Sequence, residues 1–389
     1  MRVGLVTTSF PLSTNPVSGV FVARLAEELA KRVDVTVLTP AGTETAASTQ
    51  TSFPVRYFRY APQNLQKLAH QPGGVPVALR TSPASVLFLP LFIVALFIAT
   101  LRLSRRCDVI HANWSACGAI AGLAGLLTRR PVITTLRGSD VMRLDRSKPA
   151  RWLLAVTLWT NKQVVCVSSD IENQIRRLFP RMGERVRTIP NGVDDQFLSL
   201  SHLGHNRPEL HLVAVGSLIP RKALDVAISA VARLQNSKIY LIVVGDGPER
   251  PRLEALIEEH ALGDQVRLLG AQPPHAIPGF LENADALVLT SRHEGRPNVV
   301  IEAMAAGLPV VATAIPGVRE LVPDGEVGLL FEPGDIAGLA AHLGRLLEEP
   351  DLRRELGQAG RRRVLGLGLS WDRAASAYCD LYQAAVGHR

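Results

Sequence analysis

Short apolar runs alternate with amphipathic stretches along the whole chain, a pattern typical of parallel β-strands joined by helices. Near the N-terminus, a strand at 3–7 is followed by a helix whose apolar residues share one face, and then by a strand at 33–39. Ligands of such sheets bind at the carboxyl ends of the strands. Further strands are expected at 108–113, 131–136, 164–167, 186–189, 210–215, 239–244, 266–269, 286–290 and 309–312.

The segment from about Asp195 to Pro208 lacks this periodicity and contains His, Asn, Gly and Pro, so we place a domain boundary there. The chain length of 389 residues also fits two domains. We therefore predict an α/β fold with one domain at 1–200 and a second at 208–368. An amphipathic helix is expected within the terminal segment 369–389.

The most apolar stretch covers residues 86–101 and is followed by Arg102, Arg105 and Arg106. It is slightly shorter than the roughly 20 residues that span a bilayer, and it contains Pro90. A helix packed in the core, a helix lying in a membrane interface with its arginines on the headgroups, and a transmembrane helix all fit this pattern.

Composition narrows the classes of partner. Hydrophobic residues make up 47% and charged residues 20%, which indicates a globular chain, and the net charge of +8 favours anionic partners. Aromatic residues are only 5% and no basic stripe is interleaved with them, so nucleic acid is not expected. The four cysteines lack metal-binding or disulfide spacing, and the N-terminus lacks a signal-peptide pattern, so we expect a cytoplasmic protein.

The stretch from Ser291 to Thr313 places a polar loop and a helix between two apolar runs. If Asn298 caps the helix, free N–H groups of Val299 and Val300 face the loop and can bind phosphate. Glu294 then lies in the loop and Glu302 about one turn inside the helix. Carboxylates beside an anion site fit a ligand whose hydroxyls donate to them, such as a sugar and a ribose flanking a diphosphate. An ordinary helix start with acidic residues is the alternative.

Polar residues also follow the strands of the first half. His111 and Asn113 end one strand, Arg137 and Asp140 follow the next, and Gly19 precedes the first helix, where a diphosphate could approach the backbone. Such a cluster predicts a binding edge, whereas a lone histidine or glycine would be structural.

These segments together resemble glycosyltransferase family 4, retaining enzymes with the GT-B fold of two Rossmann-like domains facing a cleft. The most specific part is the E-x7-E pattern from Glu294 to Glu302. Supporting stretches are the Gly19 loop, Asp108 to Trp114, Ile189 to Asp194, Val215 to Lys222, Gly245 to Pro248 and Ser370-Trp371.

The resemblance implies a role for each matching residue. Glu294 would contact hydroxyls of the donor sugar, Glu302 the ribose, and Lys222 the diphosphate leaving group, whose developing charge fixed cations stabilise. It also implies that the terminal helix crosses back to the first domain and that neither a metal nor another cofactor is needed. The remaining donor-binding residues would be Gly19, Gly216, Ser217, Arg221, Gly270, Pro297, Asn298 and Val299.

The chain departs from the family pattern on the acceptor side. Arg137 stands where many members have a histidine, and it cannot accept a proton, although it can grip an anion. Asn113 replaces a second histidine, and Ser217 an arginine that Arg221 or Arg296 could replace. His111, Asn113 and Asp140 are the acceptor-side candidates, and Arg137 joins Glu294 and Lys222 as a catalytic candidate.

We therefore expect a hexosyltransferase that uses a nucleotide-sugar and an alcohol acceptor, such as a lipid-linked or cell-envelope saccharide. Membrane-surface contact through 86–106 would bring such an acceptor close. A sugar-nucleotide epimerase on the same two-domain plan is the alternative enzyme, and a basic membrane- or nucleic-acid-binding module is the alternative of another class.

Overall fold

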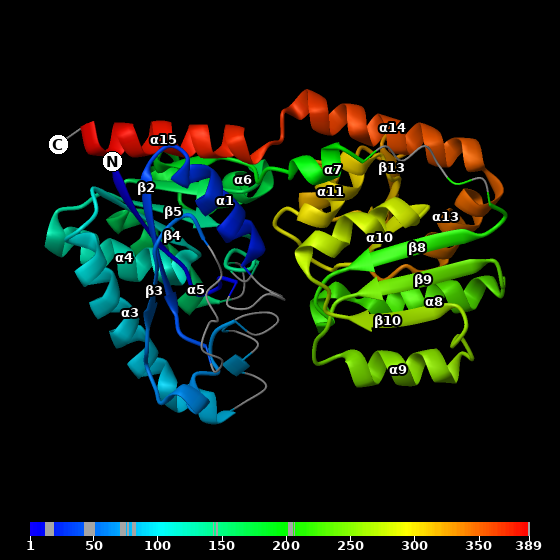
Figure 1. The fold of residues 1–389 in the computed structure, drawn as a ribbon, viewed down its shortest axis with the longest axis horizontal. Coiled ribbons are helices and arrows are strands. Elements are labelled where there is room, and N and C mark those ends of the chain that lie inside the picture. Colours follow the sequence, from blue (N-terminus) through cyan, green and yellow to red (C-terminus); the bar gives the residue numbers. More distant parts are fainter. Residues whose placement is uncertain are drawn as a thin grey trace. The chain divides into compact units, whose positions relative to one another are not determined.

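The computed structural model describes residues 1–11, 19–42, 51–70, 75, 78–79, 83–142, 144, 147–200, 205 and 207–387. The chain divides into two compact units, one made of Met1–Gly192 and Trp371–Arg389, the other of Val193–Ser370 (Figure 1). Each unit contains one parallel sheet with helices on both faces. The division falls after Gly192, just before the predicted boundary segment, of which residues 201–204 and 206 lie outside the described residues.

The first unit contains a seven-stranded sheet in the order β3-β2-β1-β4-β5-β6-β7, and every strand pair in it is parallel. The order reverses between β1 and β4, and such a reversal point is where sheets of this class bind ligands. The strands are β1 (Arg2–Val6), β2 (Asp34–Pro40), β3 (Val55–Phe58), β4 (Val109–Asn113), β5 (Val132–Leu136), β6 (Gln163–Cys166) and β7 (Val186–Thr188).

Successive side chains of a strand point to opposite faces of the sheet. The side chains of these strands therefore pack against two separate layers of helices, one on each face. Val109 packs with α1 and α15, while Ile110 packs with α3 and α4. Val164 and Cys166 of β6 pack with α5 and α6. The helical segments are α1 (Val20–Ala30), η1 (Gln63–Leu65), η2 (Pro83–Phe88), α3 (Leu89–Ser104), α4 (Ser115–Thr128), α5 (Lys148–Thr160), α6 (Ser169–Leu178), η3 (Pro180–Arg185) and α15 (Trp371–Gly387).

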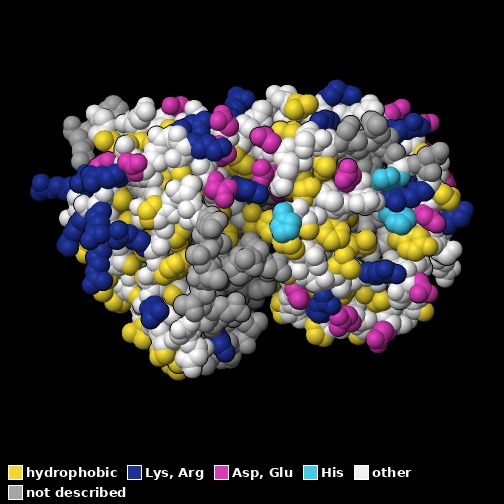
Figure 2. All heavy atoms as spheres, in the orientation of Figure 1, with side chains coloured by type: hydrophobic (Ala, Val, Ile, Leu, Met, Phe, Trp, Pro, Cys, Tyr) yellow, Lys and Arg dark blue, Asp and Glu magenta, His cyan; other side chains and the backbone are white. Residues whose placement is uncertain are grey.

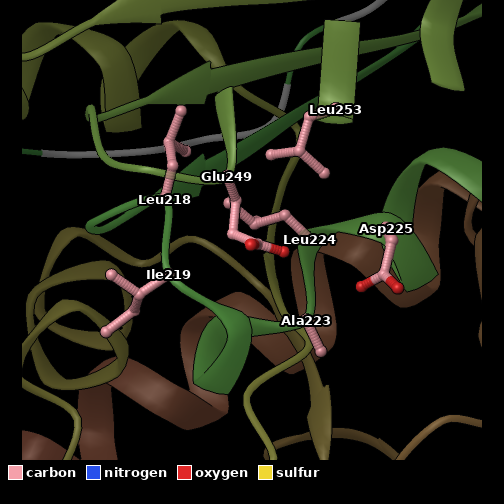
Figure 3. A pocket seen from close by; sticks show the side chains of 7 residues that line it. All are labelled: Leu218, Ile219, Ala223, Leu224, Asp225, Glu249 and Leu253. Atoms are coloured by element: carbon pink, nitrogen blue, oxygen red, sulfur yellow. The ribbon is translucent and has the colours of Figure 1, made fainter. Parts of the chain in front are cut away.

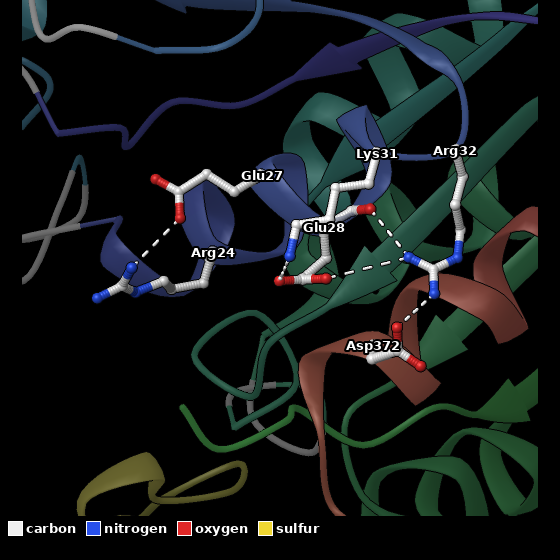
Figure 4. A network of polar contacts seen from close by, with 6 residues as sticks. All are labelled: Arg24, Glu27, Glu28, Lys31, Arg32 and Asp372. Atoms are coloured by element: carbon white, nitrogen blue, oxygen red, sulfur yellow. Dashed lines mark hydrogen bonds and ion pairs between the residues drawn. The ribbon is translucent and has the colours of Figure 1, made fainter. Parts of the chain in front are cut away.

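The terminal helix α15 belongs to the first unit although it follows the second unit in sequence. It packs along α1, and its Tyr378 and Tyr382 are buried against the sheet. Arg32 joins the two helices by donating from Nη2 to Asp372 Oδ1 at 2.5 Å (Figure 4). The sequence predicted this helix, and the family resemblance predicted that it packs against the first domain.

The second unit contains a six-stranded sheet in the order β10-β9-β8-β11-β12-β13, again parallel throughout. Here the order reverses between β8 and β11. The strands are β8 (Leu210–Val215), β9 (Ile239–Val244), β10 (Val266–Gly270), β11 (Ala286–Leu289), β12 (Val310–Thr313) and β13 (Gly328–Phe331). The helical segments are α7 (Asp195–Leu198), η4 (Pro220–Lys222), α8 (Leu224–Leu234), α9 (Arg250–Glu259), η5 (Pro274–Ala276), α10 (Ile277–Asn283), α11 (Asn298–Ala306), α12 (Pro316–Arg319), α13 (Ile336–Glu348) and α14 (Pro350–Leu367).

The apolar stretch near residue 86 forms a helix, as predicted, but α3 begins at Leu89 and is preceded by the 3-10 turn η2. Pro90 lies in the first turn of α3, where its missing N–H leaves no intrahelical hydrogen bond unmade. By length and composition alone, the segment Val86–Ser104 is long and apolar enough to cross a membrane. One side of it, including Phe92, Leu96 and Leu103, is buried on the sheet.

Candidate active site

Three residues of the predicted donor site meet at the reversal point of the second sheet. Lys222 ends η4, which follows β8, and Glu294 lies in the loop after β11, the neighbouring strand. Lys222 Nζ donates to Glu294 Oε1 at 2.7 Å, and Arg221 Nη1 donates to Glu294 Oε2 at 3.0 Å. These three side chains form an ion cluster, which we call the Glu294 triad.

Three further hydrogen bonds hold the two loops of the triad together. Thr290 Oγ1 donates to the carbonyl oxygen of Lys222 at 2.8 Å, and the Arg292 N–H donates to that of Arg221 at 2.9 Å. Arg221 Nη1 also donates to the carbonyl oxygen of His293 at 2.8 Å. The charged side chains therefore stand on backbone that is fixed before a ligand arrives, as electrostatic catalysis requires.

The Glu294 carboxylate is only 10% exposed. Burial raises its pKa, but the charges of Lys222 and Arg221 and the hydrogen bond from Lys222 outweigh burial and lower the pKa to about 2. Glu294 is therefore ionised at neutral pH. The sequence-based interpretation assigned Lys222 to the diphosphate and left Glu294 for hydroxyls alone, whereas the structure pairs the two residues directly.

Glycines lie at the carboxyl ends of the neighbouring strands β8, β9 and β10. A Cβ atom on Gly216, which follows β8, would lie 3.4 Å from Lys222 Nζ, so this glycine keeps the backbone close to the ammonium group. A Cβ atom on Gly245, which follows β9, would overlap the carbonyl oxygen of Gly216. The Gly245 N–H donates to the carbonyl oxygen of Gly270 at 2.9 Å. Gly216 and Gly270 therefore lie at one edge of the sheet with Lys222, and half-buried Ser217 follows Gly216 in the same turn.

The start of α11 differs from the predicted one. Asn298 is the first residue of the helix rather than its cap; Pro297 holds the cap position and makes no side-chain cap bond. The N–H of Val300 is not free, because it donates to the carbonyl oxygen of Pro297 at 3.1 Å. Val299 is buried, and Glu302 lies one turn inside α11 as predicted.

Of the two arginines proposed to replace a family arginine at Ser217, only Arg221 belongs to the triad. Arg296 is buried and donates from Nη1 to Glu320 Oε1 at 2.7 Å. Burial lowers the pKa of Arg296, although the charge of Glu320 acts in the opposite direction. Arg296 therefore has a structural partner away from Glu294.

A small hollow lies beside η4 in the second unit (Figure 3). Its two acidic residues, Asp225 and Glu249, both accept hydrogen bonds from Arg252, at 3.0 and 2.9 Å. None of the predicted donor-binding residues lines it, so it is distinct from the triad. Its lining residues are Leu218, Ile219, Ala223, Leu224, Asp225, Glu249 and Leu253.

In the first unit, the predicted acceptor residues converge on Arg137, which follows β5. Its Nε and Nη2 donate to Asn113 Oδ1 at 3.1 and 2.8 Å, and its Nη1 donates to Asn191 Oδ1 at 2.7 Å. The guanidinium lies over the Phe21 ring, 4.8 Å from its centroid. Burial lowers the pKa of Arg137, and no carboxylate forms an ion pair with it in the described ranges.

Asp140 and Gly19 shape the backbone beside this arginine. Asp140 accepts the N–H groups of Ser115, Arg137 and Gly138, and burial raises its pKa despite these bonds. Gly19 precedes α1 with a φ of 80°, and a Cβ atom there would lie 2.5 Å from the carbonyl oxygen of Ser9. Residues 12–18 of the Gly19 loop lie outside the described residues.

His111 is fully buried, contrary to a role in touching the acceptor. Its Nδ1 bonds the Tyr382 hydroxyl at 2.6 Å and its Nε2 bonds Thr135 Oγ1 at 2.8 Å. Burial and the nearby Arg137 lower its pKa to about 3, so it is neutral at physiological pH. His111 thus anchors α15 to the sheet, a partnership between residues too distant in sequence for its pattern to reveal.

Neither the cysteines nor the acidic residues that the structure describes form an additional reactive or metal-binding site. All four cysteines are buried and free, and burial raises the pKa of Cys117 to about 12. The part of the chain that the structure describes contains no cluster of three or more His, Cys, Asp or Glu side chains able to hold a metal ion.

Comparison with known families agrees with this architecture. The first unit matches the family "Glycosyltransferase Family 4" over residues 18–197. The second matches "Glycosyl transferases group 1" over residues 199–363. Together the two matches cover most of both units, and residues 1–17 and helix α15 of the first unit lie outside them.

Three individual proteins are similar to the chain in sequence or in fold. It is 34% identical to a lipopolysaccharide core biosynthesis glycosyltransferase of Rhizobium meliloti, over 59% of this chain and 66% of that protein. It is 28% identical to a D-inositol 3-phosphate glycosyltransferase of Acidothermus cellulolyticus, over 95% of this chain and 86% of that protein. The structure of Anabaena HepE in complex with UDP-glucose is similar in fold, with a TM-score of 0.78 at 19% identity over 99% of this chain and 100% of HepE.

Proposed function

Because the chain belongs to glycosyltransferase family 4 and has its two Rossmann-like domains, we propose that this glycosyltransferase moves a hexosyl group from a nucleotide-sugar to an alcohol, with retention of configuration. The observation that carries this proposal is the Glu294 triad at the reversal point of the second sheet. The UDP-glucose complex of HepE supports a nucleotide-sugar donor.

The triad suits the breaking of a sugar–phosphate bond. That step builds negative charge on the departing diphosphate, and a fixed cation stabilises this charge without reorganisation. The Lys222 ammonium has three N–H groups and gives one to Glu294, so two remain for phosphate oxygens. Glu294 thereby orients Lys222, and its oxygens retain lone pairs for hydroxyls of the donor sugar.

The other donor residues keep the roles that the family resemblance implies. Glu302 would accept from the ribose, and Gly216, Ser217 and Gly270 would allow the nucleotide to approach the backbone. In this proposal Pro297, Asn298 and Val299 lie at the phosphate end of α11. The reaction needs no metal ion or other cofactor, so EDTA should leave the rate unchanged.

On the acceptor side, we propose that Arg137 holds an anionic group of the acceptor rather than moving a proton. Among the described residues its guanidinium has only neutral amide acceptors, and Asn113 Nδ2 beside it is buried with no hydrogen-bond partner among them. An alcohol on a lipid-linked or cell-envelope saccharide fits this site, and the relative in lipopolysaccharide synthesis supports that class. Contact of residues 86–106 with a membrane would accompany such an acceptor.

A thermal-shift panel with UDP-, GDP- and ADP-sugars tests donor binding. A ligand present at about 100 times its Kd should stabilise the protein by roughly 2.7 kcal/mol. The Lys222→Ala variant should bind nucleoside diphosphate about tenfold to a hundredfold more weakly, since charge-assisted hydrogen bonds contribute about 1.5–3 kcal/mol. Binding of the nucleoside alone should change little.

The matched control is Lys238→Ala, which removes an exposed lysine of the same unit. Equal losses for diphosphate and nucleoside in Lys222→Ala would contradict the role of Lys222. A panel in which no nucleotide-sugar stabilises the wild-type protein would contradict the proposed donor.

A further inference from the structure

Helix α3 exposes apolar side chains that nothing in the described chain covers. Its inner side, including Phe92, Leu96 and Leu103, is buried on the sheet. The opposite side is equally apolar but exposed, and Leu87 just before the helix is 78% exposed. A helix that is apolar all round belongs in a core or in lipid, and only one side of α3 is in a core. The exposed apolar residues of this segment are Val86, Leu87, Leu91, Ile93, Val94 and Ile98.

The two neighbouring helices of the same layer extend this surface. Helix α4 packs against both α3 and α5, and all three cover one face of the first sheet. On α4, Leu123, Leu126 and Leu127 share one outward side, since residues three and four apart are neighbours on a helix. On α5, Trp152 and Trp159 are 68% and 64% exposed and are seven residues apart, so they also share a side.

Positive charge is concentrated in the segment of the chain that contains these three helices. Residues 83–162 contain 11 Lys and Arg against 3 Asp and Glu, a net charge of +8, which equals the net charge of the whole chain. Arg102, Arg105 and Arg106 at the end of α3 are exposed, and none of them forms an ion pair within the described residues. On the face seen in Figure 2, basic side chains gather over the region that Figure 1 labels α3 and α4, with hydrophobic side chains beside them.

We infer that the outer sides of α3, α4 and α5, the three-helix face, bind the surface of an anionic lipid bilayer. Leucines and valines would enter the acyl boundary, the two tryptophans would lie at headgroup level, and the arginines would meet lipid phosphates. Helix α3 is about 24 Å long and would lie flat, because its inner side remains packed on the sheet.

This inference rests on the proposed function and sharpens it. A lipid-linked acceptor lies in the membrane, and docking would hold the acceptor-side unit against the surface that contains it. A protein partner is less well matched, because basic residues flank an apolar face that lacks acidic side chains. Of the 3 acidic residues in 83–162, Asp108 pairs with Arg2 and Asp140 accepts backbone N–H groups.

Co-sedimentation with vesicles tests the inference directly. The full-length protein should pellet with vesicles of phosphatidylcholine and phosphatidylglycerol, and much less with phosphatidylcholine alone. The triple variant Arg102→Gln, Arg105→Gln, Arg106→Gln should bind roughly a hundredfold more weakly, at about fivefold for each basic residue near the surface. Leu91→Ser with Val94→Ser should also weaken binding, and its control, Leu365→Ser with Leu367→Ser on α14, should not.

Tryptophan emission gives a second readout. Trp152 and Trp159 leave water on docking, so emission should shift to the blue with anionic vesicles, and Trp152→Phe with Trp159→Phe should lose the shift. No binding by the wild-type protein, or equal binding by all variants, would overturn the inference. The inference would also be overturned if the wild-type protein were a dimer that the Leu91→Ser, Val94→Ser substitutions dissociate, since the face would then bind a second copy. Attachment to membranes that resists carbonate extraction would overturn it as well, since it would indicate insertion rather than surface binding.

Failure of docking is distinguishable from failure of the proposed function. The substitutions lie in the first unit, so stabilisation by nucleotide-sugar should be the same in these variants as in the wild-type protein. Vesicle binding without any donor binding would support the membrane-binding face but contradict the proposed enzymatic function.

Discussion

The pairing of Glu294 with two cations makes a quantitative prediction about stability in acid. The folded-state pKa of Glu294 is about 2, against an ordinary value of 4.5. Because the folded pKa is the lower one, the ionised carboxylate stabilises the fold above about pH 4.5, and this contribution disappears as the pH falls toward 2. The difference of roughly 2.5 pKa units corresponds to about 3 kcal/mol.

The perturbation is Glu294→Gln, which keeps the shape but removes the charge. At neutral pH the variant should be less stable by about 3–5 kcal/mol, because Lys222, whose side chain is largely buried, is left without its charged partner. The deficit should shrink by about 3 kcal/mol as the pH is lowered from about 4.5 toward 2. In that range the wild-type protein loses the stabilisation from the ionised Glu294 carboxylate, which the variant lacks at every pH.

Urea unfolding at a series of pH values measures this difference. Far-UV circular dichroism follows both units, while tryptophan fluorescence follows the first, because all four tryptophans belong to it. Glu259→Gln, which removes an exposed carboxylate of the same unit, is the control and should differ from the wild-type protein by a constant small amount. A stability deficit of Glu294→Gln that is the same at every pH would refute the reasoning.

Three further substitutions test other parts of the structure. Gly245→Ala should destabilise the second unit by about 2 kcal/mol or more in urea unfolding, because its Cβ overlaps the Gly216 carbonyl oxygen, whereas Gly263→Ala has open space; equal effects would refute this packing. Tyr382→Phe should cost about 1–3 kcal/mol in the same assay, because buried His111 loses a hydrogen-bond partner, and a neutral substitution would contradict the bond. Arg137→Gln should leave nucleotide-sugar binding unchanged in the thermal-shift assay and slow transfer to an anionic acceptor more than hydrolysis of the donor; equal slowing would remove the acceptor role.

Much of the fold follows from local pattern. The repeating strands and helices, the terminal helix and the position of Glu302 within α11 all follow from apolar periodicity and spacing. The pattern did not predict strands β3 and β13 or helices α5, α7, α9, α10 and α12. Helix α5 illustrates the reason, since Trp152 and Trp159 place large apolar side chains on its exposed side and blur the helical period.

The site was harder to predict because it depends on contacts between distant residues. Lys222 and Glu294 meet only because β8 and β11 are neighbours in the sheet, and strand order is not a local property of sequence. The same holds for His111, whose partner Tyr382 lies 271 residues away. The Asn298 cap was predicted from residue preference alone, whereas in the structure the cap lies one residue earlier, at Pro297, and α11 begins at Asn298.

The most direct test of the central claim is transfer of a labelled sugar. Wild-type protein is incubated with labelled UDP-, GDP- or ADP-sugars and a membrane lipid extract, and both nucleoside diphosphate release and label in the lipid fraction are measured. One donor should yield equal amounts of diphosphate and transferred label, and Glu294→Gln should lose at least about a hundredfold in rate while still binding the nucleotide. Conversion of the sugar without nucleotide release, or wild-type transfer by Glu294→Gln, would contradict the account.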